Sequence, residues 1–373
     1  MPLHDNATGW ARFAGRVATG VVECVDLATE AERLTGGGTW FVVVEFEAFG
    51  RGGRARAWRF AEVSDEAAGP QSGLPWRGPL PDQWGSTMDR AAYESAVERV
   101  RQHVREGDVY QVNVCRVLEA PLPATSTPAG DVEPDAAALA ARLAVGNPAP
   151  HAAAIHVPTD SGVEPVWVVS ASPELFLSLD AGERGPELAS GPIKGTARTP
   201  EGLTDKDRAE NVMITDLVRN DLQQVCRPGT VAVTGLLAVE HHPGLVHLVS
   251  RVSGELADDV ATAPDSWRRV LAATFPPGSV SGAPKSSALR LIDELEPTPR
   301  GPYCGAVGWV DADAGRAELA VGIRTFWWAD GVLRFGTGAG ITWGSDPAAE
   351  WRETELKAER LVGLASAVGH IVG

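Results

Sequence analysis

The sequence predicts a mixed fold, α/β or α+β, in which helices alternate with groups of strands. The first 60 residues are β-rich, with an apolar strand over 40–49 after a triple-glycine turn. Near the other end, strands over 304–337 predict a meander. A length of 373 residues permits two or three average domains or one large domain, and no stretch marks a convincing boundary.

Between those ends, helix-capping residues precede apolar-periodic stretches. Ser, Thr or Asp can accept a hydrogen bond from a free N–H group of the first helical turn, and proline is favoured at the first position. The predicted helices cover 86–106, 136–145, 204–224, 265–273, 284–296 and 346–368, with position 205 as an alternative start of the third. The predicted strands cover 109–117, 151–157, 165–171, 174–180, 304–311, 317–327 and 332–337, with a turn and strand over 226–233 and loops over 62–85, 121–134 and 278–282.

Composition limits the partners and the location. The net charge of −16, without a basic stripe, argues against a nucleic-acid partner. The four cysteines form no Cys-x-x-Cys pair, which indicates reduced thiols rather than a disulfide framework or a zinc site. The N-terminus carries no basic-then-apolar signal, and no apolar run approaches the length of a membrane span. We therefore expect a cytoplasmic protein with no membrane partner.

Lys194, in Gly191-Pro192-Ile193-Lys194-Gly195-Thr196, is the most informative single residue. Only four of the 33 basic residues are lysines. Because arginine supplies nearly every other cation, a retained lysine can serve a task that needs a neutral amine, namely nucleophilic attack. A salt-bridged surface lysine is the alternative, and the residues alone leave both open.

Two predicted helices each carry two carboxylates on one face. Asp207 and Glu210 lie three residues apart, as do Glu350 and Glu353, and Lys357 follows on the same face. Carboxylates from two helices can bind Mg²⁺, which keeps positions free for water and an anionic substrate. The alternative is an exposed Glu353–Lys357 ion pair worth about 0.3–0.5 kcal/mol.

Other features suit an anionic ligand. Residues 278–285 place small residues and free N–H groups at the start of a helix. The glycine-rich run 336–340 lets the backbone approach a ligand closely, and Arg324 can bind a carboxylate through two hydrogen bonds. No dinucleotide or P-loop motif is present, which disfavours a nucleotide. His247 lies on an apolar stretch, where a core histidine is more common than a catalytic one.

Longer motifs occur in a fixed order along the chain. They are GDVYQVN at 107–113, SPELF at 172–176, PIKGT at 192–196, DRAEN at 207–211, DLVRND at 216–221, HLVS at 247–250, GSVSGAPK at 278–285, IRT at 323–325 and ETELK at 353–357. This series resembles the chorismate-utilising enzymes, and most closely the members that form component I of aminodeoxychorismate synthases. The resemblance covers roughly 86–368.

The resemblance implies an α+β fold of two large, packed antiparallel β-sheets flanked by helices, with an active-site cleft between the sheets. It implies one chorismate-binding domain over 1–373, with the catalytic motifs within 86–368 and a divergent, shortened part at 1–85. Ala339, Thr342, Trp343 and Pro277 depart from the usual pattern of the family. No tryptophan-binding effector site is carried onto the first 85 residues.

The matched motifs also imply residue roles. Glu174 would be the general acid at the departing C4 hydroxyl, and Lys194 the nucleophile. Gln111 stands where water-using relatives carry a lysine, which argues against water as the nucleophile. The implied Mg²⁺ ligands are Glu210 and Glu353 with Asp207 and Glu350 beside them, the implied substrate-binding residues are Arg324, Lys357, Gly338, Gly340, Ser281, Gly282 and Gln111, and Thr196 and His247 complete the catalytic set.

The implied reaction is Mg²⁺-dependent amination of chorismate at C4, giving 4-amino-4-deoxychorismate for 4-aminobenzoate and folate synthesis. A separate glutaminase subunit would supply the ammonia, because no cysteine of this chain has a glutaminase-like setting. Lysine at 194, where members that aminate C2 carry alanine, favours C4. A C2-aminating enzyme of the anthranilate synthase or aminodeoxyisochorismate synthase type is the alternative, and a non-catalytic chorismate-binding subunit is disfavoured by the intact site. The oligomeric state, the pathway served and the role of His247 stay open.

Overall fold

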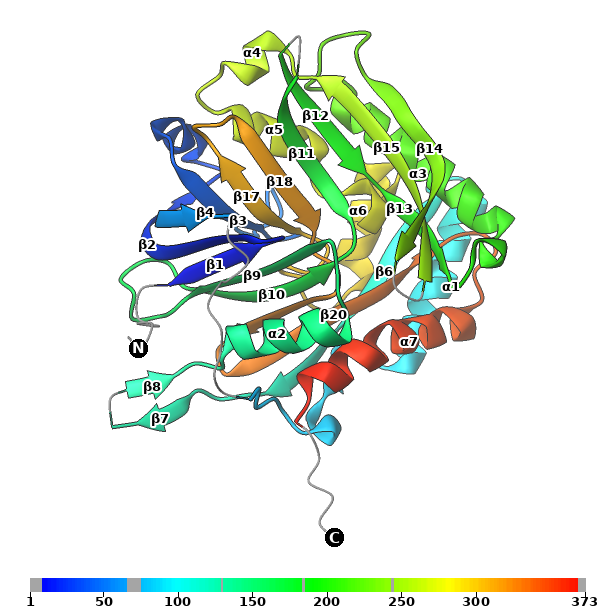
Figure 1. The fold of residues 1–373 in the computed structure, drawn as a ribbon. Helices are drawn as coiled ribbons and strands as arrows, with labels where there is room; N and C mark the ends of the chain where they lie inside the picture. The colour runs from blue at the N-terminus through cyan, green and yellow to red at the C-terminus, as the bar shows by residue number, and fades with distance from the viewer. Residues whose placement is uncertain (1–8, 66–74, 129, 183–184, 243–244, 368–373) are drawn as a thin grey trace.

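Antiparallel strand pairing organises the computed structural model, which describes residues 9–65, 75–128, 130–182, 185–242 and 245–367 (Figure 1). One run of paired strands is β6 (Gln111–Pro121), β20 (Val332–Ile341), β19 (Thr325–Ala329), β10 (Val166–Ser172) and β9 (His151–Val157). A second run is β17 (Ala306–Asp311), β18 (Arg316–Val321), β11 (Leu175–Gly182), β12 (Gly185–Gly191) and β15 (Leu245–Glu255), and β15 also pairs with β13 (Ile193–Ala197) and β14 (Ala232–His242). The predicted α+β class is confirmed.

The N-terminal strands connect these two runs. They are β1 (Trp10–Phe13), β2 (Arg16–Asp26), β4 (Ala55–Ser64) and β3 (Thr39–Val44), with β1 paired to β9 and β3 paired to β17. Short strands β5 (Gly85–Ser86) and β16 (Gly282–Ala283) pair with β6, whereas β7 (Thr125–Thr127) and β8 (Gly130–Val132) form a separate hairpin in a predicted loop. The first 85 residues therefore extend the sheets of the later chain.

The helices pack on these sheets and largely follow the predicted capping signals. They are α1 (Arg90–Glu106), α2 (Ala136–Gly146), α3 (Asp205–Gln223), α4 (Asp258–Ala261), α5 (Ser266–Thr274), α6 (Lys285–Leu295) and α7 (Pro347–Ala365), and the predicted end of α7 at Val368 lies outside the described residues. Thr204 caps α3 in a reciprocal pair with Asp207, and Asp346 caps α7. α1 begins later than predicted, because Asp89 accepts the capping hydrogen bond from the N–H of Ala92 at 2.8 Å.

One predicted strand is broken in the structure. β18 ends at Val321 and β19 begins at Thr325, although the sequence predicts a continuous strand over 317–327. Between them Arg324 has φ of 54°, a left-handed conformation that interrupts a strand. The break turns the Arg324 side chain toward the cavity described below.

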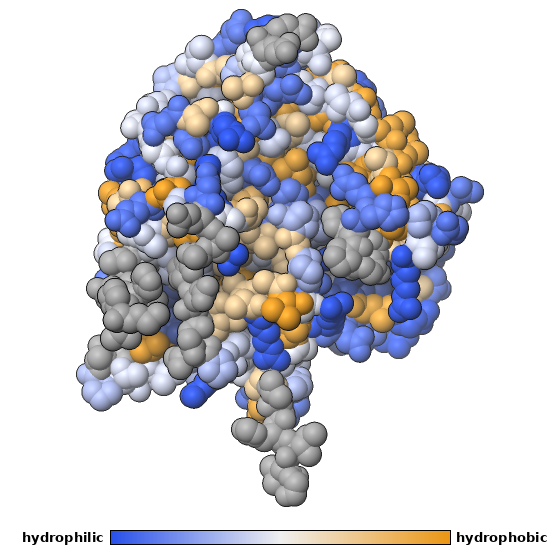
Figure 2. Space-filling view, in the orientation of Figure 1, coloured by the Kyte–Doolittle hydropathy of each residue, from blue (hydrophilic) through white to orange (hydrophobic). Residues whose placement is uncertain are grey.

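One group of exposed apolar residues lies at a sheet edge. Among the described residues β14 pairs only with β15, and Val233, Leu236 and Val239 on it are 40%, 54% and 36% exposed. Figure 2 shows apolar side chains on the side of the molecule where Figure 1 places β14. No helix in the described ranges is long and apolar enough to cross a membrane.

Candidate active site

A cavity of about 660 Å³ lies among β13, β15, β20, α3 and α7 and gathers most of the predicted site. Twelve of the fifteen predicted residues line it, namely Lys194, Glu174, Thr196, His247, Arg324, Lys357, Gly338, Gly340, Glu210, Glu353, Asp207 and Glu350. Predicted residues that are up to 183 positions apart, from Glu174 to Lys357, thus meet at one place.

Lys194 reaches the cavity from a distorted strand. The pairing of β13 with β15 shifts register between Ile193 and Thr196, as at a β-bulge. Gly195 has φ of 92°, and a Cβ there would lie 2.8 Å from Cβ of Asp207, so a side chain is excluded. Burial lowers the pKa of Lys194 and Lys357 adds to the effect, against the opposing charges of Glu210 and Glu174. The environment therefore favours the neutral amine more than water does.

Glu174 is a buried carboxyl group at the same cavity. It is 4% exposed, and its Oε1 accepts a hydrogen bond from the N–H of Ile193 at 3.4 Å. Burial raises its pKa, against the opposing effects of a hydrogen bond from Ser279 and the charge of Lys194. A carboxyl group with a raised pKa can keep a proton and act as a general acid.

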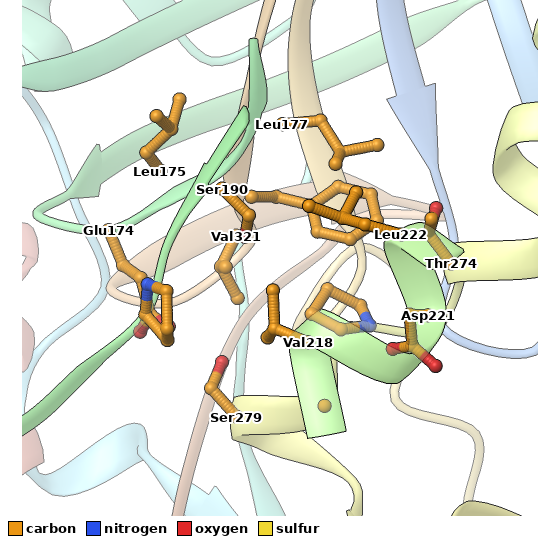
Figure 3. A pocket seen from close by; sticks show the side chains of 14 residues that line it. Glu174, Leu175, Leu177, Ser190, Val218, Asp221, Leu222, Thr274, Ser279 and Val321 are labelled. Atoms are coloured by element: carbon orange, nitrogen blue, oxygen red, sulfur yellow. The ribbon is translucent and has the colours of Figure 1, made fainter. Parts of the chain in front are cut away.

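A second, much smaller pocket lies behind Glu174 (Figure 3). Its volume of about 10 Å³ is close to that of one water molecule, and Glu174 and Ser279 line it at one end and Asp221 at the other. Asp221 accepts a hydrogen bond from Lys285 Nζ at 2.7 Å, and burial is the main cause that raises its pKa to about 6. This pocket shares Glu174 and Ser279 with the cavity and is too small for a substrate.

The predicted metal ligands line the cavity without converging. Glu353 pairs with Lys357 at 2.6 Å, so the predicted alternative of an i,i+4 ion pair is present, and Glu210 lies 3.6 Å from Lys206. Within the described ranges, only His103, Glu106 and Asp108, which do not line the cavity, bring three potential ligand atoms within 4.8 Å of one another.

The carboxylates nevertheless suit a hard cation. Glu210 Oε1 is buried without a hydrogen-bond partner. Burial raises the pKa of Glu350. A hydrogen bond from Ser345 lowers this pKa, and the nearby Glu353 carboxylate raises it. Asp207 has one oxygen that accepts hydrogen bonds from the N–H and hydroxyl of Thr204 at 2.8 and 2.7 Å. Mg²⁺ prefers such oxygen donors, so the residue types fit the predicted ion.

A glycine row on β20 forms the floor of the cavity. A Cβ at Gly338 would lie 2.5 Å from Cys115 Sγ, and one at Gly340 would lie 2.5 Å from Gln111 Nε2. The backbone is therefore bare at this place, and Lys357 Nζ donates to the Gly338 carbonyl at 3.0 Å. The excluded side chains explain the close packing against Cys115 and Gln111 of β6, and the approach of this backbone to a ligand stays a prediction.

Three predicted substrate-binding residues are not among those that line the cavity, and their roles stay predictions. Gln111 is fully buried behind Gly340. The hydroxyl of Ser281 donates to the Pro277 carbonyl at 3.0 Å. Gly282 packs against the backbone of Gln111, because β16 pairs there with β6. They form the layer behind the cavity wall.

The remaining catalytic residues pair with each other, and further residues join them. Thr196 Oγ1 and His247 Nδ1 are 2.8 Å apart on paired strands. Residues that also line the cavity, beyond those predicted, include Asn113, Asn147, Ser279, Tyr303 and Arg360. The helical spacing of Arg360 from Lys357 could have indicated its place, whereas nothing in the sequence around Asn147 distinguishes it from a loop residue.

A cavity that collects carboxylates, lysines and arginines on an antiparallel scaffold is typical of an enzyme for a small anionic metabolite. Residues 51–363 match the model of the chorismate binding enzyme family. The chain therefore belongs to the family of chorismate-binding enzymes.

Curated relatives include both anthranilate synthases and aminodeoxychorismate synthases. A component 1 of anthranilate synthase from Haloarcula marismortui is 39% identical over 291 residues, which cover 74% of this chain and 52% of the relative. An aminodeoxychorismate synthase from Streptomyces pristinaespiralis is 39% identical over 279 residues, with 72% and 35% covered. Component 1 of aminodeoxychorismate synthase from Salmonella typhimurium is 34% identical over 295 residues, with 76% and 59% covered. The matched part of the chain thus spans 35% to 59% of the length of these curated relatives.

Solved structures share the fold. A putative 2,3-dihydroxybenzoate-specific isochorismate synthase from Bacillus anthracis superposes with a TM-score of 0.76 at 21% identity, over 97% of each chain. Anthranilate synthase component I from Streptococcus pneumoniae superposes with a TM-score of 0.73 at 22% identity, over 97% of this chain and 94% of the other. At these identities the likeness concerns the architecture.

Proposed function

We propose that this protein aminates chorismate at C4, with Lys194 as a covalent nucleophile and Mg²⁺ as cofactor. The observation that carries the proposal is the position of Lys194 in the cavity near both Glu174 and Glu210. The pKa of the lysine is lowered and that of Glu174 is raised, mainly by burial in both cases. An amine that can be neutral thus lies beside a carboxyl group that can be protonated.

The two groups suffice for the bond changes of the proposed reaction. The lone pair of Lys194 forms a bond to C2, the ring double bonds shift, and the C4–O bond breaks. Glu174 gives its proton to the leaving oxygen, which departs as water. The Glu174 carboxylate then takes a proton back from the nitrogen of the Lys194 adduct. Ammonia forms a bond to C4, the double bonds shift back, and the C2–N bond to Lys194 breaks as the departing nitrogen takes a proton from the new ammonium group. The product is 4-amino-4-deoxychorismate, and the lysine amine is regenerated.

The remaining cavity residues hold the substrate in this proposal. Glu210 and Glu353, supported by Glu350 and Asp207, are the ligands for Mg²⁺, which when bound would neutralise and orient the ring carboxylate of chorismate. Arg324 and the bare backbone at Gly338 face the other parts of the substrate. The open lone pairs of Glu210 Oε1 support this assignment.

The partner and location belong to the same proposal. We infer that a separate glutaminase subunit supplies ammonia, as the words component 1 in the names of several relatives suggest. All four cysteines are free and three are buried, which suits a cytoplasmic protein without a cysteine nucleophile. The proposed product would serve 4-aminobenzoate and folate synthesis.

Amination at C2 is the second candidate, because anthranilate synthase relatives are as similar to this chain as aminodeoxychorismate synthases are. The presence of lysine at 194 favours C4, since direct attack of ammonia at C2 would not need a second amine in the cavity. Burying an amine costs free energy, so its retention there suits a chemical role.

The identity of the product from the parent chain and from Lys194→Ala tests the proposal. The parent with chorismate, Mg²⁺ and ammonium should yield 4-amino-4-deoxychorismate, and mass spectrometry of trapped enzyme should find a chorismate-derived adduct on the Lys194 peptide. The alanine variant should lose this product, and any residual amination should occur at C2. A near-parental rate of C4 amination in Lys194→Ala would refute the covalent role. Lys206→Ala, which changes another cavity lysine, is the matched control for charge.

A further inference from the structure

Asn147 has an amide group without a partner at the cavity. It is the residue directly after α2, and its backbone N–H caps that helix through the Leu143 carbonyl at 2.6 Å. Its side-chain Nδ2 is buried and makes no hydrogen bond within the described part of the chain. A buried amide donor without an acceptor costs free energy, so this residue favours a ligand that accepts a hydrogen bond.

Two arginines at the same cavity also lack a partner. Arg324 and Arg360 both line it, and neither side chain forms a hydrogen bond or ion pair with the residues that the structure describes. Burial lowers the pKa of Arg324, and the positive charge of Arg360 adds to the effect. Arg324 is half-buried and Arg360 is exposed, and two neighbouring cations that disfavour each other attract an anion.

Packing between α2 and α7 brings these groups to one place. A Cβ at Gly146 would lie 2.5 Å from Leu364, so the end of α2 closely approaches α7 there. Arg360 lies four residues before Leu364, one turn along the same face of α7. Asn147, which follows Gly146, is therefore beside the turn that carries Arg360.

On α7, Arg360 lies seven residues beyond Glu353, one of the proposed metal ligands, which is about 10 Å along the helix axis. An anion bound beside Arg360 is thus a part of the substrate away from the proposed metal ligands.

We propose that Asn147 and Arg360 are substrate-positioning residues that bind, together with Arg324, the enolpyruvyl carboxylate of chorismate. The inference rests on the proposed function, in which the metal holds the ring carboxylate and leaves the second one for this end. The two guanidinium groups and the amide nitrogen of Asn147 offer donors, and a carboxylate offers only acceptors. The geometry thereby selects a dicarboxylate over a ring acid that lacks the side-chain carboxylate.

Steady-state kinetics of Arg360→Gln, Asn147→Ala and Asn147→Asp, with ammonium as nitrogen source, tests the inference. Each variant should raise KM for chorismate about tenfold or more, which corresponds to about 1.4 kcal/mol, and change kcat by less than about threefold. Asn147→Asp should raise KM more than Asn147→Ala, because its carboxylate repels the substrate and pairs with Arg360. The melting temperature of Asn147→Asp should equal or exceed that of the parent. A purely structural role of Asn147 would not produce this result.

Arg352→Gln is the matched control, since Arg352 is an exposed arginine on α7 that does not line the cavity. A KM within about twofold of the parent in both Arg360→Gln and Asn147→Asp would overturn the inference and leave the proposed function intact. If the parent forms no aminated product, the proposed function fails. Calorimetric titration of chorismate into the parent and the same variants then measures the affinity for chorismate and tests the carboxylate subsite separately. Absence of chorismate binding to the parent would overturn both.

Discussion

Substitution of Arg300 by methionine should destabilise the protein strongly, because this arginine lies in a buried ion pair beneath the cavity. Arg300 is 1% exposed, and its guanidinium bonds to both oxygens of Glu296 at 2.8 and 2.5 Å. It also donates to the carbonyls of Val280 and Asn113 at 2.9 and 2.8 Å, and both residues line the cavity. Glu296 in turn accepts a hydrogen bond from the N–H of Cys115 at 2.9 Å.

The magnitude follows from what the substitution leaves behind. Methionine fills much of the volume but leaves the Glu296 carboxylate without its cation, and loss of one partner of a buried pair costs about 3–5 kcal/mol. A whole domain is stable by about 5–15 kcal/mol, so the loss is a large part of the total. Burial already raises the pKa of Glu296 against the effect of Arg300. Without Arg300 that pKa rises further, so the loss should be largest at neutral pH and shrink as acid protonates the carboxyl group.

Urea unfolding, followed by tryptophan fluorescence at several pH values, measures this loss. The double variant Arg300→Met with Glu296→Leu removes both charges, and should recover about 2 kcal/mol or more relative to Arg300→Met alone. A single-variant loss below about 1 kcal/mol, or a double variant no more stable than the single one, would refute the reasoning. Turnover of the single variant should fall in parallel, because the strand and loop that carry Asn113 and Val280 lose their support.

Three further predictions concern turnover. EDTA should abolish turnover and Mg²⁺ should restore it. Glu210→Gln should lower kcat/KM about tenfold or more, because a metal ligand is lost. Full activity in EDTA would contradict the metal assignment. The purified chain should aminate chorismate with ammonium at raised pH but release no product with glutamine, as product assays can check, and glutamine-dependent turnover by the chain alone would disprove the need for a partner. At constant free ammonia, kcat/KM should follow a bell-shaped pH profile with its maximum between the raised pKa of Glu174 and the lowered pKa of Lys194, because the active form needs the first protonated and the second neutral. A profile without an alkaline limb would contradict the acid role of Glu174.

Capping residues and apolar periodicity in the sequence predicted the helices and strands whose ends depend on residues next to them in the chain. The cap of α3 at Thr204 and that of α7 at Asp346 follow from side chains that bond within their own first turn. The strand at 151–157 coincides with β9. Twelve site residues share the predicted cavity because long motifs identified them together, although their individual roles stay predictions.

Long-range geometry set the features that the sequence did not reveal. The break at Arg324 depends on a backbone conformation that apolar periodicity does not indicate. Gln111, Ser281 and Gly282 belong to matched motifs, yet β16 pairs with β6 and places them one layer behind the cavity. Asn147 reaches the cavity only because Gly146 permits close packing of two helices that are distant in the sequence. Residue types alone contain no trace of such contacts.

The strand pairing described above also determines when during synthesis the cavity can exist. Asn113 on β6 pairs with Gly340 on β20, and Trp40 on β3 pairs with Val310 on β17. At a synthesis rate of about 5–20 residues per second, β6 waits about 10–45 s on the ribosome before its partner is made. During that interval the unpaired edge of β6 can pair with other chains. Folding afterwards is slow, because the paired strands are far apart in the sequence. Expression conditions that slow initiation or supply chaperones should therefore affect the yield of active protein more than that of total protein.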